Sequence, residues 1–183
     1  MKPITTLFML SILCLSLVPH QIVADDPAKS TNNLIEHACQ RSRSRDFCVS
    51  SLASDPSSQH ADLRGLASIA IKLAHKNATD LMDHIAVLAN NDTISTDPAA
   101  QQGLYDCSDN YLDAAEQLEN SLAALSENSY HDADVSNWVK AAIADAKSCE
   151  AAVEGLKFEL SHQNRVFILL AKNAFATVQV LTG

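Results

Sequence analysis

The stretch "LYDCSDNYLDAAEQLENSLAAL", residues 104–125, decides the fold. Its apolar and small residues recur at steps of three and four, which places them along one side of an α-helix. A seam with this period is typical of helices that pack side by side in a bundle, at a crossing angle of about 20°. The seam consists of Leu104, Cys107, Tyr111, Ala114, Leu118, Leu122 and Leu125.

Three other stretches show a similar period, and turn-forming segments such as "NNDTISTDP" and "SENSYHDAD" separate them. The chain has only four glycines and no alternating run rich in Val, Ile and Thr, which argues against strands. We therefore expect an all-α protein with an up-and-down four-helix bundle over residues 61–183. The expected long helices are 61–89, 99–125, 132–154 and 161–181.

Before the bundle, the segment "ACQRSRSRDFCVSSLASDP" at residues 38–56 suggests two short helices joined by a basic turn. We expect the helices at 32–40 and 47–54, which gives an N-terminal helical hairpin over residues 30–56. The second helix should stop before Pro56, because the residue that precedes a proline avoids the helical conformation. The expected caps are Ser30 or Thr31 for the first helix and Asp46 for the second.

The N-terminus resembles a secretory signal peptide. Lys2 precedes an apolar run at residues 4–18, and small residues follow near Ala24, so we expect a signal peptide at 1–24. The alternative is an uncleaved membrane anchor, but the run is shorter than the roughly 20 residues that a spanning helix needs. The sequence therefore predicts a secreted protein without a membrane segment after signal removal.

Four cysteines remain once Cys14 leaves with the signal peptide, and an even number in a secreted chain indicates disulfides. Four cysteines allow three pairings. The expected helices would bring Cys39 close to Cys48 across the hairpin, and Cys107 close to Cys149 across two bundle seams. A zinc site is the alternative, but the spacings do not fit one.

Two tripeptides fit the acceptor pattern for N-glycosylation, and secretion would expose both to the modifying enzyme. They begin at Asn77 and Asn91. The formal net charge is −9, and removal of Lys2 brings it to about −10. This charge disfavours nucleic acid and anionic lipid as partners, and it suits a basic protein. Solubility alone is the alternative explanation.

No pattern in the sequence supports catalysis, a metal or a cofactor. HExxH, GxSxG and glycine-rich phosphate loops are absent, and a single Glu-x-x-His, from Glu159 to His162, falls at a helix start. Several carboxylates share one helix, among them Asp106, Asp109 and Asp113, and a solvated helix face would explain them. We therefore expect a protein that binds another molecule and is not itself an enzyme.

Several segments together resemble the plant inhibitors of invertase and pectin methylesterase. The resemblance covers nearly the whole mature chain, and it implies one inhibitor domain at 25–183. The family has a helical hairpin followed by a four-helix bundle, and its disulfides join the first cysteine to the second and the third to the fourth. The segments are "LIEHACQ…FCVSSLASDPSS", "ADLRGLASIAI", "YDCSDNYLDAAEQL" and "WVKAAIADAKSCEAAVEG".

The resemblance implies a non-catalytic protein that blocks the active-site cleft of a carbohydrate enzyme in the cell wall (apoplast), or alternatively in the vacuole. Invertase inhibitors usually carry Pro-Lys-Phe before the helix of the fourth cysteine, but this chain reads "SENSYHDADVSNW" there. Pectin methylesterase is therefore the expected target. The alternatives are an acid invertase (beta-fructofuranosidase), or a divergent bundle without an enzyme target.

In pectin methylesterase inhibitors, bundle helices pack across the enzyme cleft. A threonine is typical just before the fourth cysteine, where this chain has a serine, which keeps the hydroxyl and loses a methyl group. The resemblance places five residues on or near the contact surface: Asp109, Asp113, Glu116, Ser148 and Glu150.

Overall fold

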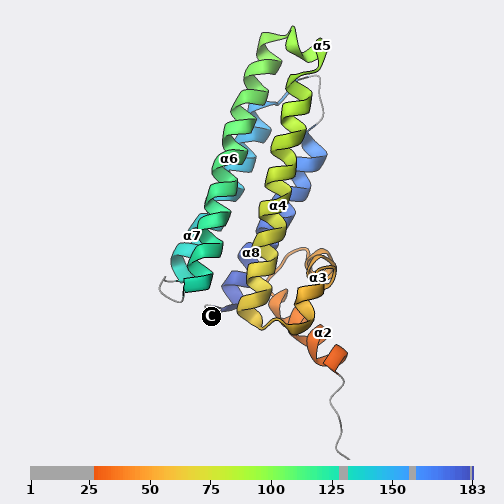
Figure 1. Cartoon of the computed structure of the whole chain (residues 1–183), viewed down its shortest axis with the longest axis vertical. Coiled ribbons are helices and arrows are strands. Elements are labelled where there is room, and N and C mark those ends of the chain that lie inside the picture. The colour runs from red at the N-terminus through yellow and green to blue at the C-terminus, as the bar shows by residue number, and fades with distance from the viewer. Residues whose placement is uncertain (1–26, 128–131, 157–159, 182) are drawn as a thin grey trace, which may run out of the picture.

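The computed structural model describes residues 27–127, 132–156, 160–181 and 183. Within these residues all regular structure is helical, and four long helices form a bundle (Figure 1). The predicted fold class is therefore confirmed, whereas the predicted signal peptide at 1–24 lies outside the described residues. The bundle helices are α4 (Leu63–Ala89), α6 (Pro98–Glu127), α7 (Asp132–Ala152) and α8 (Ser161–Leu181).

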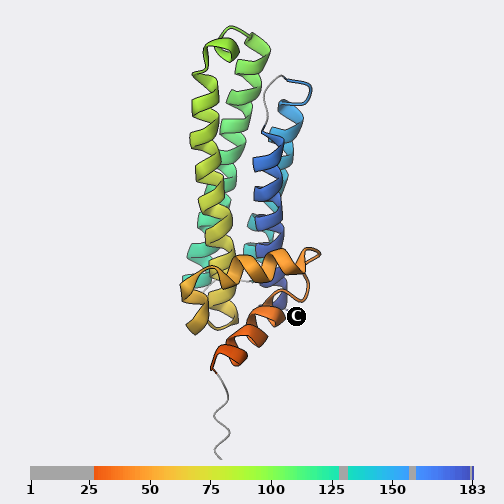
Figure 2. The same ribbon diagram turned by 90° about the vertical axis from the view of Figure 1, so that its right-hand side faces the viewer.

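The helical hairpin consists of α2 (Pro27–Ala38) and α3 (Arg45–Ala53), and a short 3₁₀ helix, η2 (Pro56–His60), connects it to the bundle. Figure 2 shows the hairpin across one end of the bundle, beside the start of α4 and the last turns of α8. The hairpin predicted at 30–56 contains no 3₁₀ helix. The prediction also omits the four-residue helix α5 (Asp92–Ser95) between α4 and α6.

Both predicted caps of the hairpin helices are wrong. Helix α2 already begins at Pro27, so Ser30 and Thr31 lie inside it, and the Thr31 hydroxyl donates to the Gln59 carbonyl instead, at 3.2 Å. Asp46 lies in the first turn of α3, where a carboxylate is favourable, rather than at the cap.

The bundle helices follow the predicted ranges within two residues. Helix α4 begins at Leu63 rather than Ala61, because the Asp62 carboxylate caps it by accepting the Gly65 N–H at 2.7 Å. Helix α7 ends at Ala152, two residues before the predicted end, and Gly155 then reverses the chain with a φ of +79°. Helix α8 has the predicted ends. In the described part of the chain, no helix combines the length and apolar character needed to span a membrane.

The predicted seam of α6 faces the core. Of its seven residues, only Leu122 is half-buried, and the other six are buried. The seam of α7 is buried at Val135, Val139, Ala142, Ala146 and Cys149. Between the two helices the backbones come close: a Cβ on Gly103 would lie 2.8 Å from the Ala152 carbonyl oxygen. Only glycine fits at this position of α6.

Two disulfides tie the elements together, and they are the pairs that the helix layout favoured. Cys39 and Cys48 join α3 to the residue that follows α2, with their Cα atoms 5.9 Å apart. Cys107 and Cys149 join α6 to α7, with their Cα atoms 4.3 Å apart. All four cysteines are fully buried, so both bonds are part of the core.

The bundle core contains a polar contact beside this seam. The Tyr111 hydroxyl donates to the side-chain oxygen of Asn164 on α8, and the Tyr111 ring meets Phe167 edge-on, with centroids 5.2 Å apart. Burial, with a smaller contribution from the Glu150 carboxylate, raises the pKa of Tyr111 well above its usual value. The phenol therefore stays neutral and keeps donating.

Replacement of Tyr111 by phenylalanine should lower the free energy of unfolding by about 1–3 kcal/mol. The ring contact survives, but the Asn164 side chain, 2% exposed, loses its acceptor bond and stays buried. Urea denaturation measures this loss. Tyr105→Phe is the matched control, because Tyr105 is 63% exposed on the same helix and should tolerate the change. Equal stability of the two variants would contradict the role of the buried hydroxyl.

Candidate enzyme-binding surface

The five residues that the resemblance singled out are all exposed, and they lie on two neighbouring helices. Asp109, Asp113 and Glu116 follow one another along α6 at steps of four and three, so they share one face. Ser148 and Glu150 lie on the last turns of α7. The close packing of α6 against α7 thus brings residues about forty positions apart in the sequence onto the same side of the bundle.

An open depression of about 510 Å³ lies between these two helices. It brings together Asp109, Asp113 and Ser148, whereas Glu116 and Glu150 do not line it. Its surface is more polar than apolar, and it carries three aspartates and no basic side chain. The full lining is Asp106, Asp109, Asn110, Asp113, Ser148, Ala151 and Ala152.

The polar groups of the depression differ in how far they are already satisfied. Asp106 accepts from the Gln102 side chain at 2.7 Å, and the Ser148 hydroxyl donates to the Ala144 carbonyl at 3.2 Å. By contrast, no described residue donates a hydrogen bond to Asp109 or Asp113. Their carboxylates are exposed and can accept bonds from the cationic or N–H groups of a partner.

Two exposed apolar side chains flank the acidic residues, and sequence reasoning missed both. Tyr105 is 63% exposed and Leu112 is 55% exposed, which makes them two of the most exposed large apolar residues of the described chain. Together with Asp109 they occupy positions i, i+4 and i+7 on the outer face of α6. Their positions in the helical period of 104–125 indicate exposure, because neither residue belongs to the buried seam.

Sequence reasoning also missed Asp145, a half-buried residue one turn before Ser148 on α7. Partial burial and, as the smaller contribution, the negative charge of Asp113 on α6 together raise the pKa of this carboxyl from 3.8 to about 6. Asp145 therefore loses its proton near pH 6, so the charge of this region changes within a mildly acidic range.

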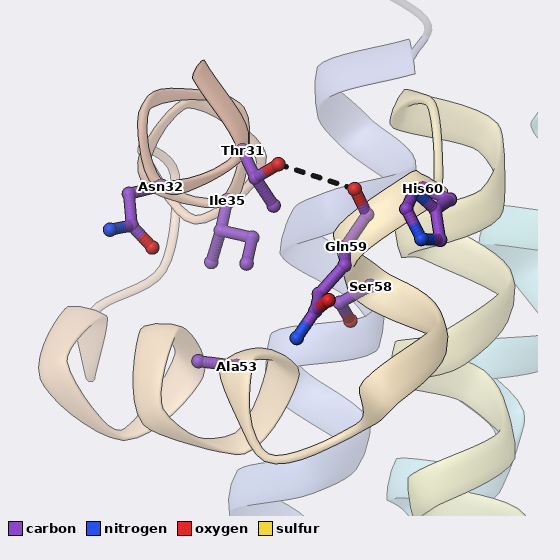
Figure 3. Close-up of a pocket in the computed structure, with 7 residues that line it drawn as sticks. All are labelled: Thr31, Asn32, Ile35, Ala53, Ser58, Gln59 and His60. Atoms are coloured by element: carbon purple, nitrogen blue, oxygen red, sulfur yellow. Dashed lines mark hydrogen bonds between the residues drawn. The ribbon is translucent and has the colours of Figure 1, made fainter. Parts of the chain in front are cut away.

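A second cavity, of about 380 Å³, lies inside the hairpin end of the molecule (Figure 3). Its walls come from α2, α3 and η2, and the bond from Thr31 to the Gln59 carbonyl crosses one side of it. The buried Ser58 hydroxyl donates to the Leu52 carbonyl at 2.7 Å. The cavity has no carboxylate or basic side chain apart from His60, and nowhere in the described residues do three potential metal ligands gather.

The two predicted glycosylation sites have very different surroundings. Asn91 is exposed and follows the end of α4. Asn77 lies in the middle of α4, is half-buried, and contributes with His84 and Gln163 to a small cavity against α8. Its side-chain oxygen is buried without a partner in the described part of the chain. A glycan has room at Asn91, whereas at Asn77 it would compete with packing against α8.

Known proteins with similar sequences were found for this chain. The family model described as "Plant invertase/pectin methylesterase inhibitor" matches residues 33–177. A "Pectinesterase inhibitor" of Actinidia deliciosa is 33% identical over 127 residues, which are 69% of this chain and 66% of that protein. A "Putative invertase inhibitor" of Platanus orientalis is 27% identical over 158 residues, 81% of this chain and 90% of that protein.

A third relative, "Cell wall / vacuolar inhibitor of fructosidase 2" of Arabidopsis thaliana, is 38% identical over 104 residues, 56% of this chain and 57% of that protein. The chain thus spans just under two thirds of the Actinidia protein and little more than half of this one. All three names are those of enzyme inhibitors, which agrees with the prediction that the chain is not itself an enzyme.

Solved structures show the same fold. A mutant form of a pectin methylesterase inhibitor from Arabidopsis superposes with a TM-score of 0.65 at 20% identity, over 77% of this chain and 92% of that one. A pectin methylesterase inhibitor from Arabidopsis thaliana gives 0.57 at 19% identity, over 79% and 93%. With the family model covering most of its length, the chain belongs to the plant invertase and pectin methylesterase inhibitor family.

Proposed function

We propose that the chain is a secreted inhibitor of pectin methylesterase and that it blocks the enzyme's substrate cleft with the outer face of α6 and α7. The observation that carries the proposal is the open acidic depression between these helices, with exposed Tyr105 and Leu112 on its α6 side. Aromatic anchors surrounded by polar groups are typical of protein interfaces.

The two kinds of side chain would contribute differently to binding. Tyr105 and Leu112 lose exposed apolar surface in the complex, so they supply most of the favourable free energy. Asp109 and Asp113 attract a basic enzyme surface and mainly raise the association rate. Ser148, Ala151 and Ala152 are small, so they allow a partner side chain to approach the α7 backbone. Inhibition by occlusion needs no catalytic group.

The choice of pectin methylesterase rests on the segment that runs from the end of α6 into the first turns of α7. Residues 126–138 read "SENSYHDADVSNW" and contain no Pro-Lys-Phe, the tripeptide that invertase inhibitors usually present there. The acid invertase remains the second candidate, because relatives with invertase and fructosidase inhibitor names also match this chain. A divergent bundle without an enzyme target is the third.

The expected organisation fits this role. We propose a signal peptide at 1–24 and an inhibitor domain at 25–183, secreted to the cell wall or sorted to the vacuole. The name of the Arabidopsis relative includes both places. The two buried disulfides suit an oxidising compartment.

Parallel inhibition assays distinguish the targets. The oxidised protein, added in excess to a plant pectin methylesterase and to an acid invertase at mildly acidic pH, should stop de-esterification and leave sucrose hydrolysis unchanged. Inhibition of the invertase alone would reverse the assignment. Failure to inhibit or bind either enzyme would favour the divergent bundle.

Charge reversal tests the proposed surface. The double variant Asp109→Lys/Asp113→Lys should weaken inhibition at least about tenfold, mainly through slower association, and the loss should be larger at low salt. Stopped-flow or surface plasmon resonance measures the two rate constants. Asp83→Lys, an exposed aspartate on α4 outside the depression, is the control. Equal effects of the two changes would place the contact elsewhere.

Asp145 should make stability depend on pH. The folded protein holds this proton more tightly than the unfolded chain does, so the contribution to stability is complete below about pH 4 and is lost as the pH rises through 6. Asp145→Asn should therefore stabilise the protein more at pH 7 than at pH 4, by on the order of 1 kcal/mol after solvent screening.

Denaturation at both pH values measures this difference, and an NMR titration follows the carboxyl carbon of Asp145 directly. Asp113→Asn should move the titration midpoint of Asp145 downwards, because it removes the neighbouring negative charge. A midpoint near pH 4 in both proteins would show that neither burial nor Asp113 perturbs the group.

A further inference from the structure

A second charged site is basic, in contrast to the acidic depression between α6 and α7. The chain carries 13 basic against 22 acidic residues, yet three of its cations line one cavity of about 320 Å³. Arg41 and Arg43 come from the turn between α2 and α3, and Lys172 comes from α8. Figure 2 shows this turn beside the last part of α8. No carboxylate lines the cavity.

Within the described residues these cations form no ion pair with an acidic side chain, although the Arg41 guanidinium lies beside Gly183. Arg45, just past the turn, pairs with Glu36 at 2.7 Å. For Arg41, Arg43 and Lys172, by contrast, no acidic side chain of the described chain lies within ion-pair distance, and all three side chains are exposed. Like charges that face one cavity repel one another, and an anion between them would relieve that repulsion.

One residue of the lining is a buried polar side chain that holds the turn in place. Asn173 lines it and is 4% exposed. Its side-chain oxygen accepts from the Ser42 hydroxyl at 2.6 Å, and Ser42 in turn accepts the Ser44 N–H at 3.0 Å. The amide nitrogen has no hydrogen-bond partner among the described residues.

The remaining wall is apolar. Phe175 and Ala176 belong to the lining, and the Lys140 ammonium lies 5.1 Å from the centre of the Phe175 ring, which adds another positive charge nearby. A cavity of this size with one apolar wall and a few convergent polar groups fits a small ligand rather than a bare ion. The ligand should combine an oxyanion with a carbon framework.

We propose that this cavity binds an acidic sugar through its carboxylate. Arg41, Arg43 and Lys172 face the carboxylate, and the C–H face of the sugar ring lies against Phe175 and Ala176. A free phosphate shares the oxyanion chemistry but cannot use the apolar wall. The site does not include the α6–α7 surface, so it is independent of the enzyme that the chain inhibits.

Calorimetric titration of the full oxidised protein tests the site. The probe is a galacturonate trimer at low salt, with its methyl ester as the uncharged ligand and inorganic phosphate as the free oxyanion. We expect saturable binding of the trimer, weaker binding of phosphate, and none of the ester. Arg41→Gln/Arg43→Gln should weaken trimer binding at least about tenfold, since two charge-assisted bonds are lost.

Lys76→Gln is the control, because Lys76 lies outside the cavity on α4 and pairs with Asp80. Trimer affinity that is the same in the arginine variant and the control would overturn the site, as would the absence of binding at millimolar trimer. Phosphate that binds as tightly as the trimer would retain the oxyanion site and overturn the sugar. The arginine variant should still inhibit its enzyme fully, which separates failure here from failure of the proposed function.

Discussion

The close approach of α6 and α7 is the constraint on which the rest of the molecule depends. Gly103 leaves room for the Ala152 carbonyl, and one turn further along the helix Cys107 is bonded to Cys149. The small residue at 103 and the Cys107–Cys149 disulfide together keep the two helix backbones closer than large side chains would allow. Because of this contact, the aspartates of α6 and the small residues of α7 line one depression instead of two separate helix faces.

Acidic and basic side chains gather at two separate places in the molecule. The acidic depression lies on α6 and α7, whereas the basic cavity lies between the hairpin turn and α8. The Cys39–Cys48 disulfide and the hydrogen bond from Ser42 to Asn173 fix the turn that carries Arg41 and Arg43. A net charge of −9 hides this arrangement, since the sum describes solubility and long-range attraction but not the local field that a ligand meets.

Most of the fold could be predicted because burial imposes a period on the sequence. The seam from Leu104 to Leu125 indicated α6 almost to its ends. Helix starts were harder: Ser30 and Thr31 misled because good capping residues also occur inside helices. The candidate site was predicted only by resemblance. The shift at Asp145 depends on its partial burial and on Asp113 from another helix, and no local pattern encodes either.

The core and the proposed enzyme-binding surface are built from different residues. Tyr111, Phe167 and the paired cysteines are buried, so a change at any of them alters the stability of the whole bundle. Tyr105, Leu112, Asp109 and Ser148 are exposed, so most changes there leave folding untouched and alter only what the surface can bind. Because the core holds α6 and α7 in fixed register, a single exposed substitution changes the shape or charge of the depression without moving its neighbours. Under the proposed function, target choice therefore depends on a few solvent-facing side chains, and the helical period that reveals the fold carries little information about it.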